Sequence, residues 1–212
     1  MLNYLDSLKW RYAVKKYDAT KKVSTEDLEQ LKEAVRLSVS SVGLQPYKII
    51  IVETQAVKEQ LAEAAGGNNK NIFADASHLF IFANEVNVGS GHVTKFIDTI
   101  VAQRGVPHEA VSGFGDYING FLAGLTDEQK NIWTVKQAYI ALSTLINSAA
   151  VLKIDATPME GFDAAKVDEI LGLGAKGLSA AVVAAIGYRH EEDAMQHAKK
   201  VRKPNEELFI TL

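Results

Sequence analysis

Hydrophobic residues recur every three or four positions along several stretches of the chain, which places them on one face of a helix. Leu28, Leu31 and Val35 follow this spacing directly after Ser24, which opens a capping box of the kind found at helix starts. Residues 90–104 show the same spacing. Both stretches therefore predict helices with one buried face.

The longest periodic stretch runs from about residue 126 to residue 152. Thr126 and Gln129 predict its start as a second capping box, and apolar residues then occupy most sides of the helix. A helix that is apolar nearly all round is buried. The sequence therefore predicts a central core helix, a dimer-interface helix, or one helix that serves both purposes.

Three short apolar runs lack the helical period and predict buried strands, at residues 48–53, 78–83 and 178–187. Helices and strands are interspersed with few simple βαβ units. We therefore expect an α+β fold, with a small mixed sheet flanked by helices. Residues 208–212 form a last apolar run, and a strand there would need a partner. An exchange of tails between the two subunits of a dimer would supply one.

Residues 105–125 differ in composition from the rest of the chain. They hold five of its 15 glycines and one of its four prolines. Glycine and proline interrupt regular structure, and such segments often carry functional loops. The composition predicts a mobile excursion that could act as a lid.

The overall composition excludes several classes of protein. The 212 residues are 47% hydrophobic, enough for one core, and we expect one domain over residues 1–212. A net charge of -3 argues against nucleic-acid binding. There is no cysteine, so thiolate catalysis and cysteine-ligated metals are excluded. No signal peptide or long apolar span is visible, which predicts a cytoplasmic protein that does not bind membranes.

Two familiar ligand-binding patterns fail on their context. Gly172–Gly177 reads GLGAKG, but a predicted helix precedes it and a strand follows, which reverses the order of a dinucleotide-binding turn. We interpret it as a tight turn. The five histidines are scattered, and none forms an H-x-x-x-H pair, so we expect no metal site.

Two basic clusters lie near opposite ends of the chain. Arg11 and Lys15 belong to the first, and Lys200 and Arg202 to the second. Lys200 and Arg202 alternate, so in an extended segment both point the same way. Two interpretations stay open on the residues alone. The clusters are ordinary solvated surface, or they converge and bind an anion such as a phosphate.

A stiff turn is predicted in TPMEGFD, residues 157–163. Pro158 fixes one backbone angle, and Gly161 permits conformations that other residues avoid. Glu160 lies between them, and Asp163 caps the helix that follows. Such a turn can present a backbone N–H to a ligand, although a plain helix entry would show the same residues.

Taken together, these stretches resemble the FMN-dependent nitroreductase family along nearly the whole chain. The resemblance is closest to its oxygen-insensitive NAD(P)H nitroreductase and dihydropteridine reductase branch. It rests on the order and spacing of RYAVKKYD, SVSSVGLQPYKIII, ADASHLFIFA, WTVKQAYIAL, TPMEGFD and KKVRKP. It implies a homodimer that binds FMN at the subunit interface. The implied reaction passes hydride from NADH or NADPH through flavin N5 to nitroaromatics, quinones or related small acceptors.

The resemblance also implies roles for single residues. Arg11, Lys200 and Arg202 match the residues that hold the FMN phosphate, and Lys15 matches a lysine at the pyrimidine edge of the flavin. The flavin performs the hydride transfer, and no side chain is strictly required as a general acid because solvent can supply protons to an open site. Lys15 and Glu160 would tune and position the ring.

Further matches surround the flavin ring. Pro158, Glu160 and Gly161 match a segment whose backbone lies near flavin N5. Asn69 matches an asparagine that hydrogen-bonds the ring, with Asn71 as the alternative.

Another group of matches comes from the second subunit. Ser40, Ser41 and Gln137 match residues that the partner subunit contributes to each flavin. An isolated subunit would therefore bind FMN poorly.

The chain also departs from the family pattern. Tyr12 and Ala13 stand at cofactor-site positions where relatives carry a histidine and a serine. A family lysine aligns with Ile72, unless a gap moves Lys70 into its place.

Residues 105–125 should line the substrate channel but match poorly. The candidate substrate contacts are Val42, Arg104 and Phe121, and the choice between NADH and NADPH stays open. Other reductive flavin chemistry or a non-catalytic FMN-binding role are the alternatives.

Overall fold

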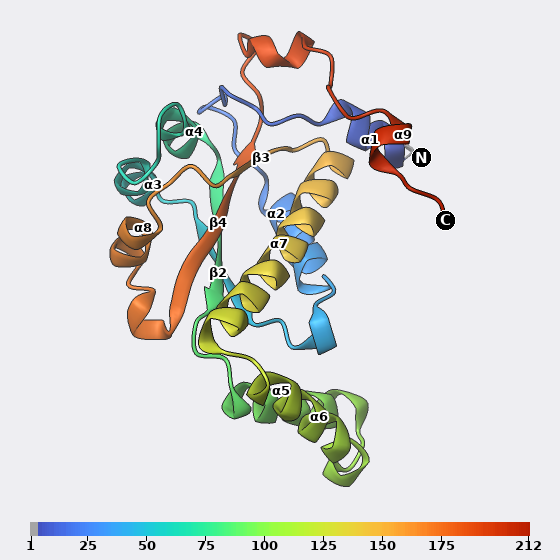
Figure 1. The fold of residues 1–212 in the computed structure, drawn as a ribbon. Helices are drawn as coiled ribbons and strands as arrows, with labels where there is room; N and C mark the ends of the chain where they lie inside the picture. The colour runs from blue at the N-terminus through green and yellow to red at the C-terminus, as the bar shows by residue number, and fades with distance from the viewer. Residues whose placement is uncertain (1–3) are drawn as a thin grey trace.

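A four-stranded sheet forms the centre of the protein in the computed structural model, which describes residues 4–212. Its strands are β1 (Tyr47–Val52), β2 (His78–Glu85), β3 (Asp155–Met159) and β4 (Leu178–Gly187), in the order β1-β2-β4-β3 (Figure 1). Every neighbouring pair is antiparallel. The expected mixed sheet is therefore wrong within the described residues. The helical connections after β1 and after β3 begin and finish at the same end of the sheet. The strand that follows each connection is therefore antiparallel to the strand before it.

The strand β3 replaces part of the turn expected around Pro158. Residues Asp155–Met159 pair with β4 along the outer edge of the sheet. Proline lacks a backbone donor, and an edge strand tolerates it because one side of the strand needs no partner. The stiff turn is therefore confined to Glu160 and Gly161, immediately after the strand.

Helices surround the sheet, and α2, α7 and α8 begin where the capping residues predict. Ser24 accepts the N–H of Asp27 at 3.0 Å, and Thr126 and Gln129 form the second capping box. The helices are α1 (Tyr4–Trp10), α2 (Thr25–Arg36), α3 (Gln55–Ala62), α4 (Asn69–Asp75), α5 (Ser90–Arg104), α6 (Ser112–Ala123), α7 (Asp127–Val151), α8 (Ala164–Leu171) and α9 (Asn205–Leu208). Short 3-10 turns are η1 (Ser41–Gly43), η2 (His108–Ala110), η3 (Gly174–Lys176) and η4 (Ala194–His197).

The two faces of the sheet are covered by different helices (Figure 1). Phe80 and Phe82 of β2 pack with α2 and α7 on one face, whereas Leu79 and Ile81 pack with α3, α4 and α8 on the other. Full burial of each such side chain contributes roughly 1.5–3 kcal/mol. Residues Gly172–Gly177 form the tight turn between α8 and β4, as expected.

Residues 105–125 are mostly helical, although their glycines predicted an excursion without regular structure. Helix α6 pairs with α5 beyond the end of the sheet, around Ile97 and Ile118 (Figure 1). A Cβ on Gly115 would lie 3.2 Å from Ile97 Cγ1, so this glycine permits the close approach of the two helices. The segment does project from the sheet, as an excursion would.

Helix α7 is buried against the sheet along one face only. Ala138, Ala141 and Leu145 are fully or almost fully buried. Ile132 and Ile140, by contrast, are 46% and 37% exposed. Lys136 lies between these two isoleucines on the same side of the helix and is also exposed, so the outward side of α7 mixes apolar and charged residues. None of the described helices is long and apolar enough to cross a bilayer.

Candidate functional site

The two basic clusters from opposite ends of the chain meet in the fold. The ammonium group of Lys200 donates hydrogen bonds to the carbonyl oxygens of Leu8, at 2.8 Å, and Arg11. Burial lowers the pKa of Arg11, and the nearby Arg202 lowers it further. The pKa of Lys200 is lowered by burial and by the same two arginines. Three cations that repel one another at one place favour an anion between them.

Arg11 carries an unused donor. Its Nε atom is buried and has no hydrogen-bond partner among residues 4–212. A buried polar group without a partner costs free energy, and a guanidinium satisfies its donors best on planar or tetrahedral oxyanions. The position therefore fits a phosphate group, which would receive this N–H. Ala13 lies two residues after Arg11, and its small side chain takes up little space beside this stretch of backbone.

The backbone around Lys15 is held by a carboxylate from far along the chain. Asp193 is 2% exposed, and its Oδ2 atom accepts the N–H groups of Lys15, at 2.7 Å, and Lys16, at 3.2 Å. Burial raises the pKa of Asp193, but these N–H groups and that of Met195 outweigh it and leave the pKa below its usual value. The side chain of Lys15 is exposed, so its backbone is fixed while its ammonium group reaches outward.

Tyr12 lies against a second anchor. The guanidinium of Arg189 stacks between the rings of Trp10 and Tyr12, 4.4 and 4.5 Å from their centroids, and pairs with the buried Asp155 at 2.6 Å. Burial raises the pKa of Tyr12 to about 12. This stack fixes the residues on either side of Arg11, and so its backbone.

The turn after β3 is tied to the loop before α4. The carbonyl oxygen of Gly161 accepts the Gly66 N–H at 2.8 Å and the Asn69 Nδ2 group at 3.1 Å. A Cβ on Gly161 would lie 2.9 Å from Asn69 Nδ2, so only glycine permits this contact without displacement. Asn69 therefore contacts the turn after β3 directly.

A cavity of about 620 Å³ opens beside this turn. Arg11, Pro158 and Glu160 line it, and α7 contributes Tyr139. The Tyr139 hydroxyl donates to Glu160 Oε1 at 2.7 Å. Cavities of this size accommodate small-molecule ligands and cofactors. The cavity therefore connects the converging cations, at Arg11, with the turn that carries Glu160.

Ser40, Ser41 and Gln137 form a separate group. The Ser41 N–H donates to Gln137 Oε1 at 2.7 Å, and Ser40 accepts the backbone N–H of Gln45 at 2.9 Å. None of the three lines the cavity at Arg11. Gln137 and Tyr139 are two residues apart on α7, and such side chains project roughly 200° apart. The cavity at Arg11 and the contact between Ser41 and Gln137 therefore lie on different sides of α7.

Comparison with known proteins now decides the family. Residues 8–188 match the Nitroreductase family. The chain belongs to the nitroreductase family. It is 36% identical to the major NAD(P)H-flavin oxidoreductase of Aliivibrio fischeri, with 98% of each chain covered.

Solved structures show the same nitroreductase-family fold. A protein of Exiguobacterium sibiricum, assigned as a nitroreductase and solved in complex with FMN, matches with a TM-score of 0.86 at 19% identity, over 100% of this chain and 98% of that one. A nitroreductase family protein of Streptococcus pneumoniae matches with a TM-score of 0.85 at 20% identity, over 99% and 100%.

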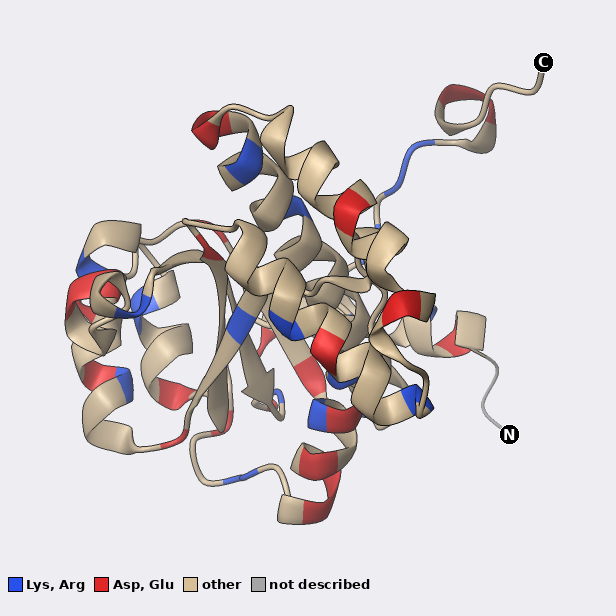
Figure 2. Ribbon diagram, turned by 90° about the horizontal axis from the view of Figure 1, so that it is seen from below, with Lys and Arg blue, Asp and Glu red and all other residues tan. Residues whose placement is uncertain are grey.

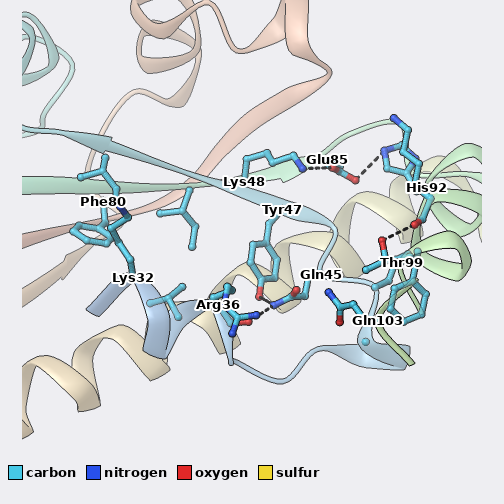
Figure 3. Close-up of a pocket in the computed structure, with 17 residues that line it drawn as sticks. Lys32, Arg36, Gln45, Tyr47, Lys48, Phe80, Glu85, His92, Thr99 and Gln103 are labelled. Atoms are coloured by element: carbon cyan, nitrogen blue, oxygen red, sulfur yellow. Dashed lines mark hydrogen bonds and ion pairs between the residues drawn. The ribbon is translucent and has the colours of Figure 1, made fainter. Parts of the chain in front are cut away.

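A groove that the sequence did not predict lies between α2, β1 and α5 (Figure 3). It encloses about 610 Å³, and its floor is apolar, with Ile49 and Ile51 of β1 among the lining residues. Its rim is mostly basic. Glu85 is the acidic member, 2.8 Å from His92 and 3.9 Å from Lys48. The cationic lining residues are Lys32, Arg36, Lys48 and Lys95.

The candidate substrate contacts are dispersed. Val42, which has a left-handed φ of 51°, and Phe121 pack on the α5–α6 cluster, and Phe121 meets Trp133 edge-on at 5.5 Å. Arg104 ends α5 and is exposed. The structure thus brings Val42 and Phe121 to one cluster and leaves Arg104 at the surface. The described residues hold no group of three or more side chains that could bind a metal.

Sequence reasoning missed Asp193, Arg189 and Tyr139. Asp193 accepts a hydrogen bond from the backbone of Lys15, and Arg189 stacks on the ring of Tyr12. Both partners lie more than 170 positions away in the chain, so neither contact leaves a local motif. Tyr139 has the clearest signal, because it lies in the stretch WTVKQAYIAL that carries the family resemblance.

Proposed function

We propose that this nitroreductase-family chain is an FMN-dependent NAD(P)H oxidoreductase that reduces nitroaromatics, quinones or related small acceptors. The observation that carries the proposal is the convergence of Arg11, Lys200 and Arg202, of which Arg11 lines the same cavity as Glu160 and carries one buried, unused donor. The name of the Aliivibrio relative and the FMN complex of the Exiguobacterium structure support the cofactor and the donor.

The chain's own residues would bind and orient the cofactor. Arg11, Lys200 and Arg202 hold the phosphate through charge-assisted hydrogen bonds, each worth roughly 1.5–3 kcal/mol. Lys15 reaches the ring from a backbone that Asp193 fixes. Bound FMN supplies the hydride acceptance and donation that protein side chains cannot perform. A cation near the ring favours its reduced, more negative form.

The turn and its neighbours orient the ring. Pro158 and Glu160 line the cavity, and Asn69 holds the turn through the carbonyl oxygen of Gly161. Tyr12 and Ala13 keep the backbone at Arg11 in place and accessible.

The turn yields a direct prediction. Gly161→Ala should displace Asn69, since the added Cβ would lie 2.9 Å from its Nδ2 atom. The loss of about one hydrogen bond should weaken FMN binding by ~1 kcal/mol. A fluorescence titration of the apoprotein with FMN measures this. Gly174→Ala is the matched control, because a Cβ at Gly174 would have no neighbouring atom within 4 Å. Equal affinity for both variants and the parent would remove the turn from the site.

The second group of residues requires a second subunit. Ser40, Ser41 and Gln137 lie away from the cavity at Arg11, so a complete site needs them from a partner. The exposed Ile132 and Ile140 on α7 supply an apolar surface for that contact. We therefore propose a homodimer with one FMN at each copy of the interface.

The tail supports an exchange between subunits. Residues 205–212 are exposed throughout, and Figure 2 shows α9 standing away from the body of the subunit. In this single chain residues 208–212 form no strand. The open edge of β1 and the groove beside it offer unpaired backbone groups, an apolar floor and a basic rim. A partner's acidic and apolar tail, with Glu206, Glu207 and Phe209, matches that surface in charge and in character.

An anaerobic titration tests the function. The purified protein is loaded with FMN, and NADH or NADPH is added while the visible flavin absorbance is recorded. We expect stoichiometric bleaching by at least one donor, then recovery of the colour when a quinone or nitroaromatic is added. A protein that takes up no FMN would refute the proposal. A protein that binds FMN without bleaching would be a flavin-binding protein of another kind.

A further inference from the structure

The hydrogen bond between Tyr139 and Glu160 places a carboxylate in the proposed flavin cavity under the control of α7. We propose that Tyr139 is a positioning residue that raises the reduction potential of bound FMN by holding and partly neutralising the Glu160 carboxylate. The inference rests on the proposed function, because it concerns the same cavity.

Glu160 is held at two places, through its side chain and through the backbone of the next residue. Tyr139 follows the buried Ala138 on the longest helix, and its hydroxyl lies 2.7 Å from Glu160 Oε1. On the other side, the carbonyl oxygen of the next residue, Gly161, accepts hydrogen bonds from Gly66 and Asn69. The backbone of Glu160 is thus tied to the loop before α4 and its side chain to α7. The hydrogen bond from Tyr139 restrains the position of the carboxylate's negative charge, although Glu160 itself is exposed.

Tyr139 remains a donor in the neutral pH range. Burial, its hydrogen bond to Glu160 and the charge of Glu160 raise the pKa of Tyr139 to about 12. A phenol O–H that donates to a carboxylate draws electron density from it and lowers its effective charge. Without this donor, Glu160 would present its full negative charge to the cavity.

The sign of the effect follows from electrostatics. Reduction adds electron density to the flavin ring, so a nearby negative charge disfavours the reduced form and a nearby positive charge favours it. Within the described lining of this cavity, Arg11 and Glu160 are the charged residues. Glu160 is the one of the two that disfavours reduction, and Tyr139 lowers its effective negative charge. Its loss should therefore make the flavin harder to reduce.

The test is the midpoint potential of bound FMN, measured by equilibration with a reference dye in four proteins. Tyr139→Phe should weaken the preference for reduced over oxidised FMN about threefold to tenfold, and a tenfold change corresponds to ~30 mV for two electrons. Glu160→Gln should shift the potential upward. The double variant should show little further effect of Tyr139→Phe. Tyr188→Phe, outside the cavity lining, should leave the potential unchanged.

The outcomes separate this inference from the proposed function. A parent protein that binds no FMN would refute the proposed function and leave no potential to tune. FMN bound with parental affinity, but with the same potential in Tyr139→Phe, would overturn the inference alone. An equal downward shift of Tyr139→Phe with and without Glu160→Gln would also overturn it, because Tyr139 would then act independently of the carboxylate.

Discussion

Arg11→Ala should weaken FMN binding by about 3 kcal/mol, roughly 150-fold, at the upper end for a hydrogen bond to a charged group. Arg11 is the most buried of the three converging cations, and its Nε atom is the unused donor at the site. Arg202 is exposed and already donates to its own neighbour's carbonyl, so Arg202→Ala should cost less, about 1.5 kcal/mol. Fluorescence titration of each apoprotein with FMN measures both losses.

The stability of the apoprotein distinguishes binding from folding. Burial and Arg202 both disfavour the charge on Arg11, so its removal relieves repulsion when no anion is bound. We therefore expect Arg11→Ala to unfold at the parental temperature or above it. Lys9→Ala is the matched control, because Lys9 is exposed, lies two residues away and pairs only with Asp6 at 3.4 Å within the described chain. A destabilised Arg11→Ala variant with parental FMN affinity would make Arg11 structural and would remove the phosphate assignment.

This convergence marks the limit of what the sequence could predict. The alternation of Lys200 and Arg202 suggested that both side chains point the same way, but it left solvated surface and an anion site as alternatives. The contact that brings the two clusters together joins Lys200 to Arg11, 189 positions away in the chain. No local period encodes such a contact. It depends on the hydrogen bonds that lay residues 188–193 along residues 15–18, above all those of Asp193.

Local rules succeeded where one stretch determined the outcome. The three apolar runs at residues 48–53, 78–83 and 178–187 became β1, β2 and β4, and the capping boxes began α2 and α7. They failed where tertiary contacts override propensity. Gly115 lies inside α6 because a larger residue there would crowd Ile97 of α5. Pro158 lies in β3 because an edge strand tolerates the missing backbone donor.

Strand direction was the other failure. The interspersed helices suggested a mixed sheet, yet all pairs among the described strands are antiparallel. Direction depends on which end of the sheet each connection reaches, and the hydrophobic pattern of a strand is the same in either direction. The position of β1 at an edge follows from the same topology. The open edge of β1 is the surface on which the proposed exchange of tails depends.

Deletion of residues 205–212 should dissociate the proposed dimer at micromolar concentrations and reduce FMN binding with it. Leu208 and Ile210, which share one face of an extended tail, are 57% and 86% exposed in the single chain. Burial of such a side chain contributes roughly 1.5–3 kcal/mol, so these two should contribute roughly 3–6 kcal/mol per tail before the cost of ordering the segment. Sedimentation equilibrium over a dilution series, with FMN content measured in each fraction, gives both quantities.

Point variants locate the contact. Ile210→Glu should reproduce most of the deletion, because it would bring a charge onto the apolar floor at Ile49 and Ile51. Thr211→Glu is the matched control, since neighbouring residues of a strand face opposite sides and its side chain would point away from that floor. A truncated protein that stays dimeric with full FMN content would refute the exchange. The site shared through Gln137 would survive that result, because it depends on the contact of α7 helices and not on the tail.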